Sequence, residues 1–137
     1  VIAAYQQLGF KLVVDPSVNY SGYFDARSRS ITMKQIDDSV YHELGHFLAF
    51  IAGNADKTAS FQSIFAAEKA NVTAFNKAYV TQNASEYFAE SVKDYILNNA
   101  SLKSSRPQTY AAVQNALNQI TDAQIAKIQK IYGAFWN

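Results

Sequence analysis

The chain contains two histidines, His42 and His46, and both lie in the run His42-Glu43-Leu44-Gly45-His46. An α-helix turns once in about 3.6 residues, so side chains four apart share a face and two imidazoles can reach one metal ion. Glu43 projects from the edge of that face, where it can take a proton from a metal-bound water without binding the metal. The spacing therefore predicts a zinc site on a helix with a base beside it. The alternative is a pair of polar residues on an ordinary amphipathic helix.

Length and composition restrict the remaining possibilities. With 137 residues, the chain is long enough for one hydrophobic core and too short for two, so a single domain over residues 1–137 is expected. The formal net charge is +1 and the basic residues are dispersed, which argues against nucleic acid as a partner. No apolar run approaches the roughly 20 residues of a membrane span. Cysteine is absent, so disulfides and cysteine-bound metals are excluded.

Local patterns predict a small N-terminal sheet beside a mainly helical C-terminal half. Strand patterns come first and helical patterns dominate afterwards, which is typical of the α+β class. The sheet region should contain a short helix over 2–8 closed by Gly9, a strand over 11–15 stopped by Pro16, and a hairpin of 20–24 with 30–33.

The helix that carries the histidines is expected to begin after Asp37 or Asp38 and to end at Gly53. Gly45 in its interior costs about 1 kcal/mol, which indicates either the close approach of another segment or a tolerated glycine. Residues 71–82 give no decisive pattern. Further helices are expected over 61–69 and 83–97, followed by two that are each opened by a capping box, Ser105 with Gln108 and Thr121 with Gln124.

A catalytic zinc ion needs three protein ligands and an exchangeable water, so the histidine helix is one ligand short. The chain has no third histidine, and the missing ligand must be a carboxylate. A thermolysin-type enzyme would use a Glu about 20 residues beyond the second His, but Ala66 lies there and Glu68 is in a different helical phase. The main candidates are Asp56, Glu68, Glu86, Glu90 and Asp94.

Glu86 and Glu90 are the better pair, because residues four apart share one helical face. One of them can bind the metal while the other hydrogen-bonds a ligand imidazole and fixes its tautomer. A nearby dication also removes the repulsion between the two like charges. Two other interpretations stay open: Glu86 can complete a capping box with Asn83, or Glu86, Glu90 and Lys93 can form a solvated face.

The histidine run, followed downstream by Ser85-Glu86-Tyr87-Phe88-Ala89-Glu90-Ser91, resembles the catalytic domain of anthrax lethal factor. It is also similar to the smaller secreted relatives of that domain, the Pro-Pro endopeptidases of Gram-positive bacteria. The resemblance covers residues 41–95 and, more loosely, the glycine-bearing hairpin upstream. It implies a zincin-type zinc metalloendopeptidase that holds one Zn²⁺ ion and cleaves peptide or protein substrates.

The resemblance also assigns roles to individual residues. Glu86 is the third zinc ligand beside the two histidines, and Glu90 supports a zinc-binding His. Tyr79, seven residues before Glu86, stabilises the transition state. From its place beside the two histidines, Glu43 is expected to be the general base for the attacking water.

Location and oligomeric state follow as expectations. Val1 is not an initiator Met, which indicates a mature or trimmed chain whose signal segment is gone. Together with the secreted relatives, this predicts an extracellular protein of a Gram-positive bacterium. We expect a monomer with no membrane span.

Two departures from the family pattern concern the substrate. Ser85 precedes Glu86 where the small relatives have an acidic residue, and the one Trp of the chain is Trp136 rather than a residue of the upstream sheet. A preference for proline around the cleaved bond is therefore left open. We expect the substrate to bind as an extended strand along the edge formed by residues 30–33.

Two other functions fit part of the pattern. A catalytically inactive zincin-fold module for binding or toxin delivery would keep the fold and the metal without hydrolysis. Such a site would not need Glu43 beside an open coordination position, which argues against this function. A thermolysin-like enzyme would instead use Glu68 as its third ligand.

Overall fold

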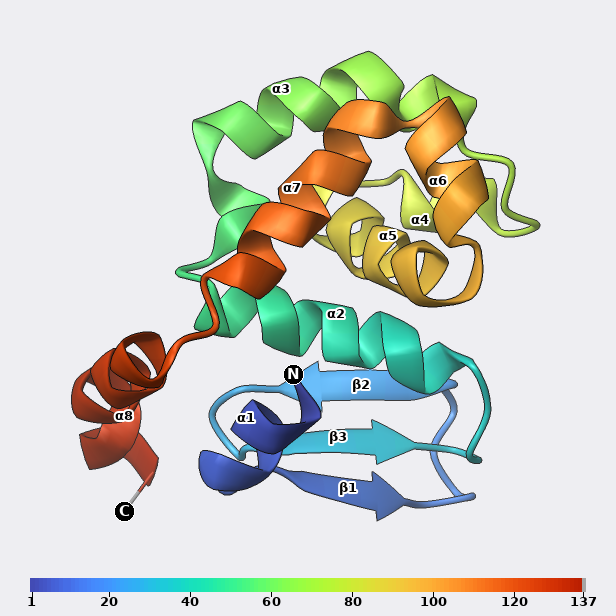
Figure 1. Ribbon diagram of the computed structural model, residues 1–137. Helices are drawn as coiled ribbons and strands as arrows, with labels where there is room; N and C mark the ends of the chain where they lie inside the picture. Colours follow the sequence, from blue (N-terminus) through green and yellow to red (C-terminus); the bar gives the residue numbers. More distant parts are fainter. Residues whose placement is uncertain (137) are drawn as a thin grey trace.

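The computed structural model describes residues 1–136, which form an α+β fold with a small sheet and many helices (Figure 1). The three strands are β1 (Lys11–Val14), β2 (Gly22–Asp25) and β3 (Ser30–Met33). The α-helices are α1 (Ile2–Gln7), α2 (Ser39–Ile51), α3 (Ala59–Glu68), α4 (Lys77–Val80), α5 (Ala84–Leu97), α6 (Asn99–Ser105), α7 (Pro107–Asn118) and α8 (Asp122–Trp136). Two 3-10 turns, η1 (Ala55–Lys57) and η2 (Lys69–Asn71), flank α3.

The sheet has the strand order β1-β3-β2. The predicted hairpin is confirmed, because β2 pairs antiparallel with β3 and Gly22 lies opposite Met33. β3 also pairs in parallel with β1, with Lys11 opposite Ser30. The expectation that β3 offers a free edge is therefore wrong: β3 is the central strand, and the free edges belong to β1 and β2.

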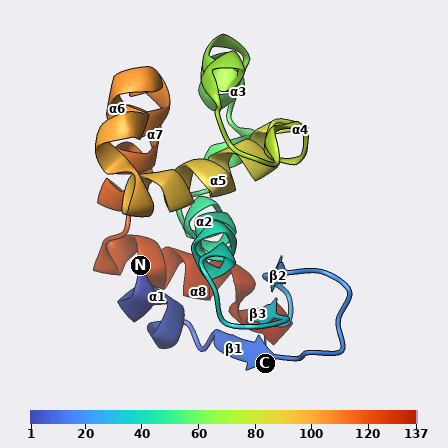
Figure 2. The same ribbon diagram turned by 90° about the vertical axis from the view of Figure 1, so that its right-hand side faces the viewer.

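Helix α2 lies between two hydrophobic cores (Figures 1 and 2). On one side, Phe47 and Ile51 pack with α1, the sheet and α8. On the other side, Leu48 and Ala49 pack with α3, α5 and α7. Because α2 is covered on both of these faces, its position relative to the sheet and to α5 is fixed by burial on each side. None of the helices within residues 1–136 has the length and apolar content needed to cross a membrane.

Several predicted helix ends are confirmed. Asn83 caps α5 by accepting a hydrogen bond from the Glu86 amide at 2.8 Å. Thr121 accepts one from the Gln124 amide at 3.1 Å at the start of α8. Gly53, just past α2, has a φ of +73°, a left-handed conformation that glycine adopts without strain.

The predicted start of α2 is also confirmed: Asp38 occupies the N-cap position without a side-chain cap, and Asp37 accepts the Ser39 amide at 3.0 Å. Other predicted details are wrong. Ser105 does not cap α7, because it ends a helix, α6, that the sequence analysis did not expect. Local cues missed α6 because its seven residues follow α5 directly, so that Asn98 ends one helix and begins the next. The undecided stretch 71–82 contains the short helix α4.

Gly45 allows α2 and α5 to touch. A Cβ atom at Gly45 would lie 2.6 Å from the carbonyl oxygen of Ala89 and 2.7 Å from its Cα. Carbon atoms do not pack at such distances, and the obstacle is backbone that cannot rotate away. The glycine therefore lets the histidine helix lie directly against the helix that carries Glu86 and Glu90.

We predict that Gly45→Ala lowers the free energy of unfolding by about 1–3 kcal/mol, despite the better helix propensity of Ala, because α5 must move away. Thermal or urea unfolding measures this change. Gly133→Ala in α8 is the matched control: there the added Cβ meets the end of the flexible Gln129 side chain at 3.3 Å. Equal stability of Gly45→Ala and Gly133→Ala would show that the helices are not in close contact.

Candidate metal centre and active-site cleft

Three side chains from two helices converge on one point. His42 and His46 lie one turn apart on α2, and Glu86 lies in the first turn of α5. The Glu86 carboxylate is 3.2 Å from Nε2 of His42 and 2.9 Å from Nε2 of His46. One donor atom from each of the three residues lies within 4.8 Å of the others, so this group could hold a metal ion.

Glu90 supports this group from one helical turn further along α5. Nδ1 of His42 donates to Oε1 of Glu90 at 2.9 Å, and Lys93 approaches the second oxygen at 3.9 Å. Glu90 is 8 % exposed, so the contact is shielded from water. A hydrogen bond from Nδ1 leaves Nε2 of His42 directed at Glu86, which is the orientation that a metal ligand requires.

The charges of the group are strongly coupled. Burial opposes the charged form of His42, but hydrogen bonds to Glu86 and Glu90 outweigh it and raise the pKa of His42 to about 9. Burial would raise the pKa of Glu86, yet the hydrogen bonds from His42 and His46 lower it well below its usual range. Glu86 is therefore an anion at neutral pH, facing two imidazoles.

The donor set fits zinc. Two imidazole nitrogens and one carboxylate oxygen are a common ligand set of hydrolytic zinc sites. Oε2 of Glu86 is 3.2 Å from Nε2 of His42 and Oε1 is 2.9 Å from Nε2 of His46, so the carboxylate and both imidazole nitrogens face the same point. One donor atom of each residue lies within 4.8 Å of the others, close enough to share an ion.

Glu43 lies beside the donor group without belonging to it. Its side chain is buried, and burial raises the pKa of its carboxyl, while the two histidines and the Phe24 amide partly offset this effect. β2 passes next to it: a Cβ atom at Gly22 would lie 2.9 Å from Cγ of Glu43. A glycine is therefore needed where the strand crosses Glu43.

Tyr79 lies at the open side of the group. It belongs to α4, is 54 % exposed, and its ring centre is 6.4 Å from that of His42. Partial burial and the nearby Glu86 carboxylate raise the pKa of Tyr79 to about 12. The phenol is therefore neutral at physiological pH and remains a hydrogen-bond donor.

The other carboxylates considered as ligands are engaged elsewhere. Glu68 accepts hydrogen bonds from the Thr109 amide at 2.8 Å and the Gln108 amide at 3.1 Å, and so caps α7. Asp56 accepts from the Ser85 hydroxyl at 2.6 Å, and Asp94 is paired with Arg106 at 2.5 Å. Within residues 1–136, these three side chains do not join the donor group.

A cleft of about 370 Å³ opens beside the donor group, and its wall includes His42, Glu43, Tyr79 and Glu90. Two residues near the donor group were not predicted from the sequence: Gly22 on β2, which lines the cleft, and Phe24, whose ring stacks on His46 at 6.4 Å. A glycine inside a strand is a signal for close backbone approach, and that signal could have identified Gly22. Phe24 carries no comparable local signal.

The chain matches one family model and one curated relative. The family model described as "Anthrax toxin lethal factor, N- and C-terminal domain" matches residues 22–116, which include every residue of the donor group. The chain belongs to this family. The matched range starts at β2 and ends in α7, so it contains both helices that form the donor group and most of the cleft wall.

A curated relative gives a second match. Over 78 residues the chain is 41% identical to the "Pro-Pro endopeptidase" of Clostridioides difficile (strain 630). The aligned segment covers 54% of this chain and 34% of that protein. The match thus spans about a third of the relative's length. No solved structure matches the chain.

We predict that Glu86→Ala abolishes tight zinc binding, because the donor group loses its only anion, whereas Glu68→Ala keeps it. Isothermal titration calorimetry on the metal-free variants measures both affinities. Glu68→Ala should instead lower the melting temperature, since the amides that begin α7 lose their acceptor. The opposite outcome, with zinc lost in Glu68→Ala and retained in Glu86→Ala, would identify Glu68 as the ligand.

Glu90→Ala should weaken zinc binding by about 10- to 100-fold without abolishing it, because His42 loses the acceptor that orients its ring. Competition with a chromophoric chelator measures the change. Lys93→Ala is a control on the same helix, since it leaves the His42–Glu90 hydrogen bond in place. An unchanged affinity in Glu90→Ala would show that Glu90 does not support the site.

Proposed function

We propose that this chain is a zinc-dependent endopeptidase of the zincin type, acting as a single catalytic domain outside the cell. The observation that carries the proposal is the convergence of His42, His46 and Glu86 beside a buried carboxyl, Glu43, at an open cleft. Membership of the lethal factor family and the identity with a protein named as an endopeptidase support it.

Each residue of the site has a distinct part in the proposed reaction. Zinc held by the three donors would supply Lewis acidity, which polarises a peptide carbonyl and lowers the pKa of water towards neutral. Glu43 accepts a proton from the attacking water and transfers it to the leaving amine. Glu90 keeps the ring of His42 in its binding orientation. The neutral Tyr79 hydroxyl donates a hydrogen bond to the carbonyl oxygen as negative charge develops there.

The peptide is proposed to align along β2, not along β3 as the sequence analysis expected. β2 is a free edge of the sheet, and Gly22 and Phe24 lie next to the base and to His46. An extended peptide can add to such an edge through main-chain hydrogen bonds. This placement brings a peptide bond close to both the metal donors and Glu43.

An inactive binding module remains the competing function. It would retain the donor group, but it would not need a buried carboxyl with a raised pKa beside an open side of the site. The arrangement of Glu43 and Tyr79 around the donor group favours catalysis over binding alone.

Glu43→Gln should abolish peptide cleavage, by at least about a thousandfold in kcat, while zinc affinity stays within a fewfold of wild type. The amide keeps the size of the side chain but cannot accept the proton. Cleavage of a quenched fluorescent peptide and calorimetric zinc titration provide the two readouts. Retained cleavage in Glu43→Gln would contradict its role as base.

Tyr79→Phe should lower kcat about 10- to 1000-fold with a smaller effect on KM, because the lost hydrogen bond forms mainly in the transition state. Tyr95→Phe in α5 is the control, since its ring packs on Tyr110 at 5.0 Å and lies outside the cleft wall. Equal loss of kcat in both variants would argue against a specific role for Tyr79.

An undirected peptide library, digested and analysed by mass spectrometry with and without a chelator, tests substrate choice. We expect chelator-sensitive cleavage with proline enriched around the cleaved bond, as the name of the curated relative suggests. Cleavage without proline enrichment would retain the endopeptidase and reject the proline preference. Cleavage that persists in the chelator would reject the zinc mechanism.

A further inference from the structure

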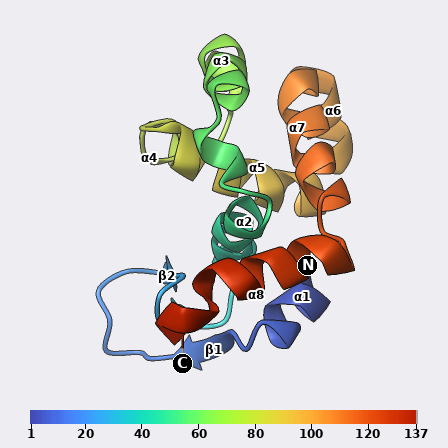
Figure 3. The ribbon, with the colours of Figure 1, turned by 90° about the vertical axis from the view of Figure 1, so that its left-hand side faces the viewer.

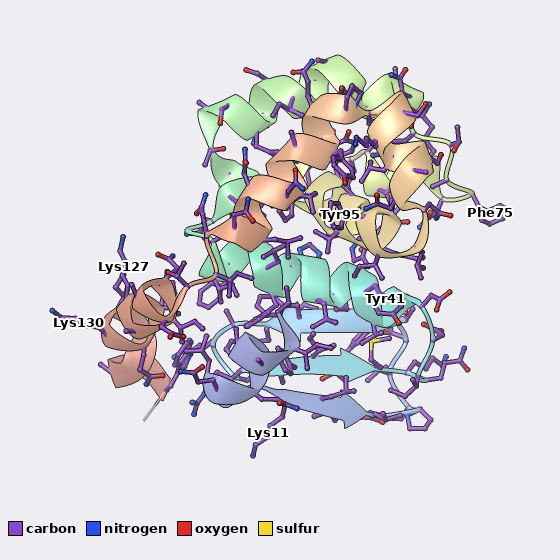
Figure 4. All side chains as sticks on the ribbon, viewed as in Figure 1. Lys11, Tyr41, Phe75, Tyr95, Lys127 and Lys130 are labelled. Carbon is purple, nitrogen blue, oxygen red and sulfur yellow. The ribbon has the colours of Figure 1, made fainter. Side chains whose placement is uncertain are left out.

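A second hollow, of about 420 Å³, lies beyond the carboxyl end of β2. Its wall is almost entirely apolar and combines Phe50 of α2 with Tyr132, Phe135 and Trp136 of α8. Figure 3 shows the C-terminal half of α8 crossing the end of the sheet. Lys127 and Lys130 point away from the molecule on the outer face of α8 (Figure 4). Tyr132 and Trp136 of the same helix pack against the core.

The hollow is linked to the metal site by a row of aromatic rings. The Phe24 ring stacks on His46 at 6.4 Å and lies 6.2 Å from Phe50. Phe50 in turn lies 4.9 Å from Tyr132 and 6.4 Å from Trp136. A row of ring contacts therefore runs from His46 to the wall of the hollow.

The strand register shows which backbone groups of β2 face its free edge, where a peptide could pair. Ser21 accepts from the Lys34 amide at 3.1 Å, so Ser21, Tyr23 and Asp25 direct their backbone groups towards β3. Gly22, Phe24 and Ala26 consequently direct theirs to the free edge. A bound peptide would meet this edge next to Glu43 and follow it towards Ala26.

Trp136 ends the free edge. Its indole N–H donates to the Ala26 carbonyl at 3.0 Å, so this outward group is no longer available to a peptide. Arg29 holds the indole in place, with its guanidinium 5.1 Å from the ring centre and 3.3 Å from the Trp136 carbonyl. A peptide that pairs with Gly22 and Phe24 must therefore leave the sheet at Ala26, where the hollow begins.

Resting on the proposed endopeptidase function, we propose that this hollow is a substrate subsite that binds a large apolar side chain, aromatic or branched aliphatic, of the peptide. Antiparallel pairing with β2, the slightly more favourable arrangement, places residues on the N-terminal side of the cleaved bond there. Phe135, 74 % exposed at the rim, would lose contact with water when the side chain enters. The chain thus selects substrates by a second contact away from the scissile bond.

The test compares pairs of peptides that share one cleavage site. The two peptides of a pair carry Phe or Ser at the same position N-terminal to that site, and each pair probes a different position. At the position that meets the hollow, wild type should cleave the Phe peptide with a kcat/KM about tenfold or more above that of the Ser peptide. The variant Phe135→Ala should reduce this ratio by about threefold or more, and Ala26→Leu, which fills the hollow, should reduce it as well. Ile131→Ala is the matched control, because Ile131 is an exposed residue of α8 outside the hollow, and it should keep the wild-type ratio.

The outcomes separate the subsite from the reaction itself. If wild type cleaves neither peptide, the proposed endopeptidase function fails. If wild type cleaves both peptides equally at every position, or if Phe135→Ala and Ala26→Leu keep the wild-type ratio, the subsite is rejected and the endopeptidase stands. Circular dichroism of the variants confirms that a changed ratio does not come from unfolding.

Discussion

The contact between α2 and α5 at Gly45 is the constraint on which the rest of the site depends. The two histidines lie on one helix and the two glutamates on the other, and no loop connects them directly. A Cβ atom at Gly45 would meet the Ala89 backbone at 2.6 Å, so only glycine allows the separation that places Glu86 within 3.2 Å of both imidazoles. The close approach of the α2 and α5 backbones therefore determines which side chains meet in the donor group.

The opposite face of α5 is held by a buried polar network. The Tyr87 hydroxyl lies 2.6 Å from the Thr109 hydroxyl, which donates to Glu68 at 2.7 Å. Arg106 donates to the Ser91 hydroxyl at 3.2 Å and lies over the Tyr87 ring. Tyr87 and Ser91 directly follow Glu86 and Glu90 in the sequence, so the same turns of helix are anchored on one face and present carboxylates on the other. Satisfied networks of this kind fix one arrangement of helices.

Helical periodicity made much of the candidate site accessible from the sequence. It places His42 beside His46 on one face and Glu86 beside Glu90 on another, since each pair lies within one helix. Which carboxylate meets the histidines was not accessible in this way, and it depended on the resemblance to the lethal factor family. The decisive contact, between Gly45 and Ala89, joins segments far apart in the chain.

The wrong predictions for β3 and for the α7 cap also arise from contacts between segments that are far apart in the chain. The central position of β3 comes from its parallel pairing with β1, which local alternation of side chains does not encode. The cap of α7 is Glu68, a partner from another helix, rather than the nearby Ser105 that a local motif favoured. The contact between Gly22 and Glu43 was predictable only in part. A glycine within a strand indicates that another segment lies close, but it does not indicate which one.

Anomalous diffraction at the zinc absorption edge, from crystals of the zinc-loaded protein, tests whether His42, His46 and Glu86 bind one zinc ion. We predict one strong peak at bonding distance, about 2.0–2.1 Å, from Nε2 of His42, Nε2 of His46 and one oxygen of Glu86, with Glu90 still hydrogen-bonded to His42. A peak at Glu68 or Asp56, or no peak between α2 and α5, would contradict it.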